Sequence, residues 1–84
     1  MNENERFMVY ELDDSGEKKK VEVAEDELQS FLIKHPEQVF VIIREDLRRI
    51  FIWKGSKSPV NKRFISSKVA RNIQQEFKDD LRVG

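Results

Sequence analysis

Two continuous apolar runs in the middle of the chain limit the fold more than any other feature. They are "VFVII" at residues 39–43 and "IFIW" at residues 50–53. Neither run alternates between apolar and polar residues, which is typical of strands whose two faces are both covered. The segment between them, "REDLRR", is short enough for a tight turn around Glu45 and Asp46. The runs therefore predict a central antiparallel pair of strands with a covering layer on each side.

The segments before this pair predict a hairpin and a short helix. "RFMVYEL" and "EKKKVEV" have the composition of strands, and "DDSG" between them supplies a turn. In "AEDELQSFLIKHP" the acids at the start suit the positive end of a helix dipole, and Leu28, Phe31 and Leu32 fall on one helical face. Pro36 ends this helix, which supplies one covering layer.

The last segment predicts the other layer. Ser58 followed by Pro59 is typical of an N-cap and first helical position, and no Pro or Gly follows before Gly84. We therefore expect a helix of about twenty residues. Its apolar stripe consists of Ile65, Val69, Ile73 and Phe77, with Ser66 and Ala70 alongside.

Together these elements predict an α/β (α+β) fold in the order ββαββα. A mixed sheet of about four strands lies between one long C-terminal helix and one short helix. The 84 residues suffice for a single small domain, which we place at residues 6–84. Residues 1–5, "MNENE", are expected to be a disordered terminus.

The residue inventory argues against an enzyme. The chain has one His and no Cys, so neither a His-paired thiol nor a zinc site of His and Cys is easily built. The three glycines are isolated, which leaves no phosphate-binding loop. A secretory leader and a membrane-spanning run are also lacking. We expect a non-catalytic cytoplasmic protein without a cofactor.

Charge is distributed unevenly along the chain. Residues 1–38 carry eleven acids and five bases, whereas residues 39–84 carry five acids and eleven bases. The basic half suits an acidic partner, although an ordinary solvated face is the alternative interpretation. Nucleic acid is a weaker possibility, because Phe51 and Trp53 lie in runs predicted to be covered, and RNA-binding sheets present their aromatic residues on an open face.

Phe64 lies away from the apolar stripe of the last helix. At roughly 100° per residue it falls on the opposite side, which it shares with Lys68, Arg71 and Gln75. A lone exposed Phe is often without function. On a face that is otherwise polar it is also typical of an anchor for a protein partner.

The stretch "VFVIIREDLRRIFIWKGSKSPVNKRFISSKVARNI" resembles the gelsolin/villin/severin domain. It has an apolar strand, a short turn, a second strand that ends in aliphatic-Trp-x-Gly, a polar loop and a long helix. The resemblance extends from Arg6 to about Asp80, because "FMVYELDDSGEKKKVEV" is similar to the family's opening hairpin. It implies a non-catalytic, actin-binding domain that modulates the assembly of actin or actin-like filaments.

The resemblance also implies which residues act. The partner-binding face of the long helix would comprise Phe64, Lys68, Arg71, Asn72 and Gln75, with Phe64 as the apolar anchor. Lys68 stands where the family often has an aliphatic residue. Phosphoinositide binding, another property of the family, would draw on a basic patch of Arg48, Arg49, Lys54, Lys62 and Arg63.

The positions that match the family's calcium ligands are Gln38 and Lys62. A neutral amide and an ammonium stand there in place of two carboxylates, and a cation repels Ca²⁺. We therefore expect no metal at this position.

Several alternatives stay open. Family domains continue with another strand after the long helix, whereas this sequence stops at "DDLRVG". Either that strand is dispensable here, or the 84 residues are a fragment whose sheet is left with an open edge. An open edge favours a homodimer or a strand from a partner. The rivals to actin binding are a scaffold or self-association module that has lost actin, and a basic-patch binder of phosphoinositide or nucleic acid.

Overall fold

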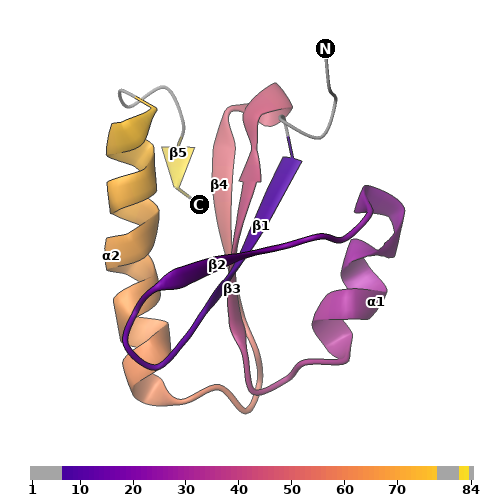
Figure 1. Cartoon of the computed structure of the whole chain (residues 1–84), viewed down its shortest axis with the longest axis vertical. Coiled ribbons are helices and arrows are strands. Elements are labelled where there is room, and N and C mark those ends of the chain that lie inside the picture. Colours follow the sequence, from indigo (N-terminus) through magenta and orange to yellow (C-terminus); the bar gives the residue numbers. More distant parts are fainter. Residues whose placement is uncertain (1–6, 78–81, 84) are drawn as a thin grey trace.

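A computed structural model describes residues 7–77 and 82–83 of the chain. The expected disordered terminus, residues 1–5, lies outside the described residues. The described chain forms one sheet with a helix on each face (Figure 1). Its strands are β1 (Phe7–Leu12), β2 (Lys18–Val21), β3 (Val39–Arg44), β4 (Arg49–Lys54) and β5 (Arg82–Val83), in the spatial order β2-β1-β3-β4-β5.

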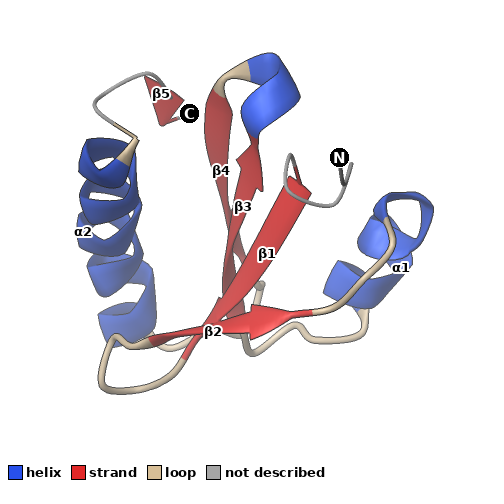
Figure 2. Ribbon diagram, turned by 45° about the horizontal axis from the view of Figure 1, so that its top comes forward, coloured by secondary structure: helices blue, strands red, loops and turns tan. Residues whose placement is uncertain are grey.

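The two helices cover opposite faces of this sheet, as the sequence predicted. The long helix α2 (Val60–Glu76) lies along one face, and the short helix α1 (Leu28–Ile33) lies on the other, after a 3₁₀ turn at Glu25–Glu27. A second direction of view shows the same separation of the helices by the strands (Figure 2). The predicted fold class and the order of the first six elements are confirmed.

Strand β3 occupies the centre of the sheet and supplies both cores. It pairs antiparallel with β1 and with β4, so its side chains are enclosed on both edges and both faces. Val39, Val41 and Ile43 pack toward α2, whereas Phe40 and Ile42 pack toward α1. The absence of alternation in "VFVII" follows from this position, because each face of the strand needs apolar residues.

Strand β4 is less covered than the sequence predicted. Ile50 is fully buried under α2, but Phe51 and Trp53 are half-buried on the α1 side. Helix α1 has only six residues, and Phe51 and Trp53 pack at the margin of the cluster that its Leu32 forms with Val9, Phe40 and Ile42. The ring of Trp53 packs against Phe40, with 5.9 Å between the ring centroids.

A fifth strand follows α2 and was not predicted. Strand β5 pairs in parallel with β4, with Arg82 opposite Arg49 and Val83 opposite Ile50. The Arg82 amide donates a hydrogen bond of 3.0 Å to the Arg48 carbonyl oxygen. Two residues are too few to show a strand pattern, and the pairing exists because β4 offers an unpaired edge. Among the described residues the sheet therefore has five strands, whereas about four were predicted.

The start of α2 also differs from the prediction. Pro59, not Ser58, is the N-cap residue, with an extended ψ of 149°. The Ser58 hydroxyl donates instead to the Gly55 carbonyl oxygen at 2.7 Å and closes the preceding turn. An N-cap residue needs no helical φ and ψ, so proline fits this position. The helix has 17 residues.

Candidate protein-binding face on the long helix

The outward side of α2 carries two large apolar residues near its start. Phe64 is 82% exposed and Val60 is 76% exposed. They are four residues apart, so they lie on the same side of consecutive helical turns. The other exposed residues along this line are polar or charged, among them Lys68, Arg71 and Gln75. The helix thus presents an apolar tip followed by a cationic stretch.

The inward side of the same helix fixes this orientation. Ser66, Val69, Ala70 and Ile73 are buried against the sheet. Because they occupy one stripe, the residues on the opposite side, Phe64 among them, must face solvent. The helix cannot turn Phe64 inward without exposing this stripe.

The turn between β1 and β2 holds the helix from a second direction. Gly16 in this turn has a φ of +89°, and a Cβ atom on it would lie 2.9 Å from Cγ2 of Ile65. Only glycine combines that backbone conformation with so close an approach. The turn itself is closed by the Asp13 carboxylate, which accepts from the Ser15 hydroxyl and from the Ser15 and Glu17 amides. These hydrogen bonds, the one from the Ser15 hydroxyl first, lower the pKa of Asp13.

All five residues predicted for the partner-binding face are exposed on α2: Phe64, Lys68, Arg71, Asn72 and Gln75. Asn72 lies toward the margin of the face, about 80° around the helix from Phe64 at roughly 100° per residue. Val60 belongs to the face and was missed by the sequence analysis. Its spacing of four residues from Phe64 was the available signal. We call Val60, Phe64, Lys68, Arg71 and Gln75 the outer face of α2.

The charges beside the apolar tip are uncompensated. Within residues 7–77 and 82–83, neither Arg63, Lys68 nor Arg71 forms an ion pair. Their positive charge is therefore available to a partner. An acidic surface with an apolar cleft is the chemistry that matches the outer face.

The predicted basic patch is not one surface. Arg48 and Arg49 lie at the first end of β4, whereas Lys54 lies at the other end, about 16 Å away at roughly 3.3 Å per residue. Arg63 is exposed near the start of α2, and Lys62 is buried. The five residues were grouped because they are close in sequence, but an extended strand separates them.

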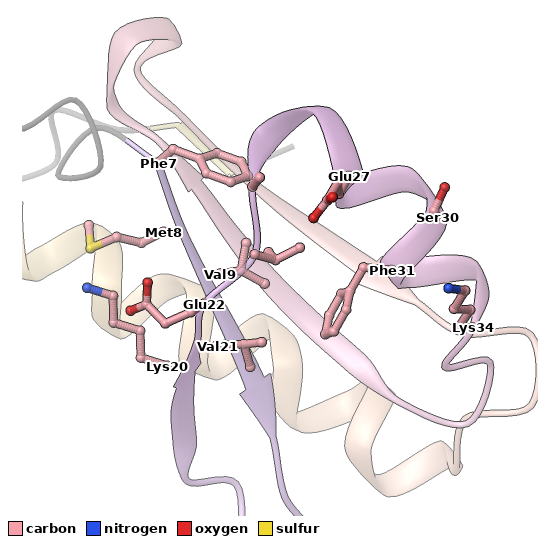
Figure 3. A pocket seen from close by; sticks show the side chains of 12 residues that line it. Phe7, Met8, Val9, Lys20, Val21, Glu22, Glu27, Ser30, Phe31 and Lys34 are labelled. Atoms are coloured by element: carbon pink, nitrogen blue, oxygen red, sulfur yellow. The ribbon is translucent and has the colours of Figure 1, made fainter.

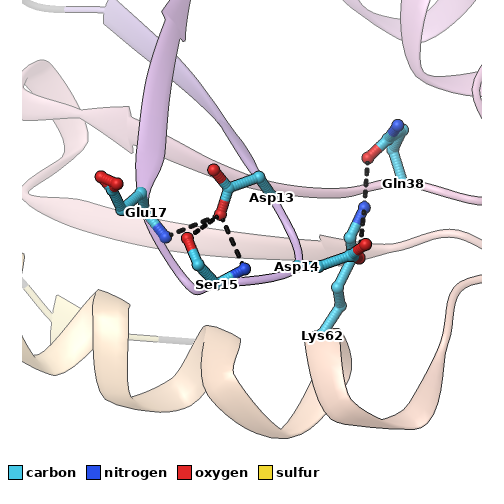
Figure 4. Close-up of polar contacts among 6 residues, drawn as sticks. All are labelled: Asp13, Asp14, Ser15, Glu17, Gln38 and Lys62. Atoms are coloured by element: carbon cyan, nitrogen blue, oxygen red, sulfur yellow. Dashed lines mark hydrogen bonds and ion pairs between the residues drawn. The ribbon is translucent and has the colours of Figure 1, made fainter.

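Lys62 lies where α2 meets two loops, pointing inward (Figure 4). Its side-chain nitrogen Nζ donates to Oε1 of Gln38 at 3.0 Å and lies 3.7 Å from Oδ1 of Asp14. The residue is only 8% exposed, although its neighbours in the sequence, Asn61 and Arg63, are exposed. The structure thus brings together the two positions, 38 and 62, that the family resemblance had linked.

The architecture matches a known structure. The fold is similar to a chain in the crystal structure of the Thorarchaeota ProGel/rabbit actin complex, with a TM-score of 0.75. The match covers 92% of this chain and 80% of that chain at 19% sequence identity. The chain has a gelsolin-like fold. No protein-family model matches the sequence, and no curated protein matches it. The likeness at this identity concerns the fold, and the predicted resemblance is confirmed at that level.

The gelsolin-like fold implies a calcium position, and the residues here do not fit one. Ca²⁺ takes six to eight oxygen ligands, usually with several carboxylates. Position 38 supplies an amide oxygen, and position 62 supplies an ammonium in place of a ligand. The Lys62 ammonium already contacts this amide oxygen and Oδ1 of Asp14. Among the described residues no group of three or more His, Cys, Asp or Glu side chains is arranged to hold a metal ion.

The gelsolin-like domain also has a groove on the other side of the sheet (Figure 3). It has a volume of about 740 Å³ and lies between the β1–β2 hairpin and the segment that leads into α1. Apolar residues such as Val9, Val21 and Phe31 line it, with Lys20, Glu22 and Glu27 around them. The groove is separated from the outer face of α2 by the sheet.

No helix among the described residues is long and apolar enough to cross a membrane.

Proposed function

We propose that this domain binds actin or an actin-like filament through the outer face of α2, without catalysing a reaction. The observation that carries the proposal is Phe64, which is 82% exposed on a helix side that is otherwise largely polar. The matched neighbour of the same fold was crystallised as a complex with actin. That complex supports actin as the partner class and therefore cytoplasmic localisation.

The apolar tip supplies most of the expected binding energy. Transfer of a fully exposed Phe side chain into a partner's apolar pocket contributes about 1.5–3 kcal/mol. Val60 lies one helical turn before Phe64 and would enter the same cleft. A single aromatic anchor flanked by smaller contacts is the usual distribution of energy in a protein interface.

The cations further along the helix supply orientation and association rate. Lys68 and Arg71 follow the apolar tip on the same side of α2 and have no acidic partner within the described part of the chain. Opposite charges on a partner accelerate encounter and fix the register of the helix in the cleft. A domain bound in this way to a filament subunit would modulate assembly.

Co-sedimentation with filamentous actin tests this proposal. We expect the wild-type domain to pellet with filaments and Phe64→Ala to lose at least tenfold in affinity. Ile33→Ala is the matched control, because Ile33 is also a large exposed apolar residue, 66% exposed, but lies on α1 across the sheet. The control should bind like the wild type.

Three results would contradict the proposal. They are a wild-type domain that does not pellet, a Phe64→Ala variant that pellets fully, and equal losses in both variants. Absence of pelleting together with a concentration-dependent dimer would favour the self-association module. The edge strands argue against simple pairing of two sheets, since β2 carries three lysines and β5 begins with Arg82.

A further inference from the structure

Three loops meet at the end of the sheet where α2 begins. They are residues 13–17, 35–38 and 55–58, and with the first turn of α2 we call them the loop junction. The Gly55 amide donates to the Gln38 carbonyl oxygen at 2.9 Å, and the Lys57 amide donates to the Pro36 carbonyl oxygen at 2.9 Å. A Cβ atom on Gly55 would lie 2.0 Å from the Pro36 oxygen, so these backbones touch.

The Lys62 ammonium lies inside this junction. It joins α2 to Gln38, 24 residues away in the sequence, and to Asp14 in the turn between β1 and β2. A buried ammonium is tolerated only where oxygen atoms replace its lost water. No other cation contacts Gln38 or Asp14 among the described residues. One side chain therefore links three segments that are distant in sequence.

We propose that the Lys62 ammonium is a built-in cation that holds the loop junction and the start of α2 in place without a divalent metal. Its two partners, an amide oxygen and a carboxylate oxygen, are also the ligand types of Ca²⁺. A metal would have to displace a positive charge that is covalently attached to the helix. At the position where the fold implies Ca²⁺, this chain thus has the Lys62 ammonium as its cation.

This arrangement bears directly on the outer face of α2. Lys62 lies between Val60 and Phe64 on the first turns of the helix, and it is buried while they are exposed. Holding its side chain in the junction holds the turn that carries the apolar tip. The regulatory consequence, which rests on the proposed actin contact, is that binding is insensitive to Ca²⁺. Lys62 acts here as a positioning residue.

Urea denaturation in Ca²⁺ and in EGTA tests the proposal without actin. The fluorescence of Trp53, the only tryptophan, reports unfolding. The wild-type midpoint should be the same in both conditions. Lys62→Glu places a carboxylate beside Gln38 and Asp14, so we expect an unfolding constant at least tenfold higher in EGTA and a recovery on adding Ca²⁺. Arg63→Glu is the matched control, with the same charge change at an exposed neighbour, and should show neither effect.

A wild-type domain stabilised by Ca²⁺ would overturn the proposal, as would Lys62→Glu being as stable as Arg63→Glu in EGTA. If Lys62→Glu does not fold in either condition, Lys62→Gln decides: we expect it to be less stable than Arg63→Gln, and equal stability would overturn the proposal. If the wild-type domain does not bind actin but the denaturation results are those expected above, the proposed function is refuted and the role of Lys62 stands.

Discussion

The inner and outer faces of α2 belong to one helix, but only the inner face packs against the rest of the described fold. On the inner face, Val69, Ala70 and Ile73 are buried, and the sheet explains each of them. On the outer face, Val60 and Phe64 are apolar and exposed, and no contact within the described fold explains them. Phe64 and Ile65 are adjacent in sequence and similar in character, yet only Ile65 packs against the core. Apolar residues that the fold does not use are those that point to a partner.

The largest expected effect is on the inner face. Ile73 is 1% exposed in the core between α2 and the sheet, so Ile73→Ala removes buried methyl groups and leaves a cavity. We expect a loss of about 3 kcal/mol in the free energy of unfolding, measured by urea denaturation. The fraction that remains folded should still bind actin. A loss below about 1 kcal/mol would show that the inner face is not the core described here.

Phe64→Ala should produce the opposite result. Because Phe64 is exposed, we expect its replacement to change the free energy of unfolding by no more than about 0.5 kcal/mol, while actin affinity falls at least tenfold. The same purified sample should be used for denaturation and for binding. If Phe64→Ala loses both stability and actin affinity, Phe64 contributes to the fold, and the distinction between the two faces is wrong.

The cations of the outer face should have an intermediate effect. Lys68→Glu together with Arg71→Glu reverses the charge beside the apolar tip without touching it. We expect a few-fold slower association with actin and a weaker dependence of affinity on salt than in the wild type. Stopped-flow measurements at two ionic strengths check this. Unchanged rates would assign binding to Phe64 and Val60 alone.

The smallest expected effect is a pH dependence of stability. The pKa of Asp13 is lowered by the Ser15 hydroxyl and neighbouring amides, so the ionised carboxylate is favoured in the folded state. Its contribution is therefore complete above the ordinary pKa of 3.8 and is lost as the pH falls through the lower folded value. Asp13→Ala should weaken stability slightly at pH 7 and reduce the difference in stability between pH 7 and pH 3. Unchanged acid sensitivity would contradict this assignment.

Local patterns were sufficient to predict the layers of the fold. The unbroken apolar run of β3 reflects a strand that is enclosed on both faces, whereas the similar run of β4 predicted more cover than that strand has. The four-residue spacing from Ile65 to Phe77 reflects a helix that packs on the sheet. The exposure of Phe64 followed from the same periodicity, because one stripe determines the direction of the opposite side. The partner-binding role given to that side stays a proposal.

Composition and periodicity could not predict contacts between distant segments, although the family resemblance had linked positions 38 and 62. Lys62 was placed in a basic patch with Arg63, whereas its side chain is buried and its ammonium contacts Gln38 and Asp14, which come from elsewhere in the chain. Strand β5 pairs with the edge of β4, and its two residues show no pattern of their own. Arg48 adopts a φ of 55°, a left-handed conformation that an arginine in the sequence does not predict.

Hydroxyl-radical footprinting of the domain with and without actin tests the central claim most directly, because it reports the accessibility of individual side chains. Phe64 on α2 and Leu47 in the turn between β3 and β4 are both exposed and oxidisable. We predict that actin suppresses oxidation of Phe64 and leaves Leu47 unchanged. Oxidation of Phe64 that continues at the same rate in a saturated complex would contradict binding through the outer face of α2.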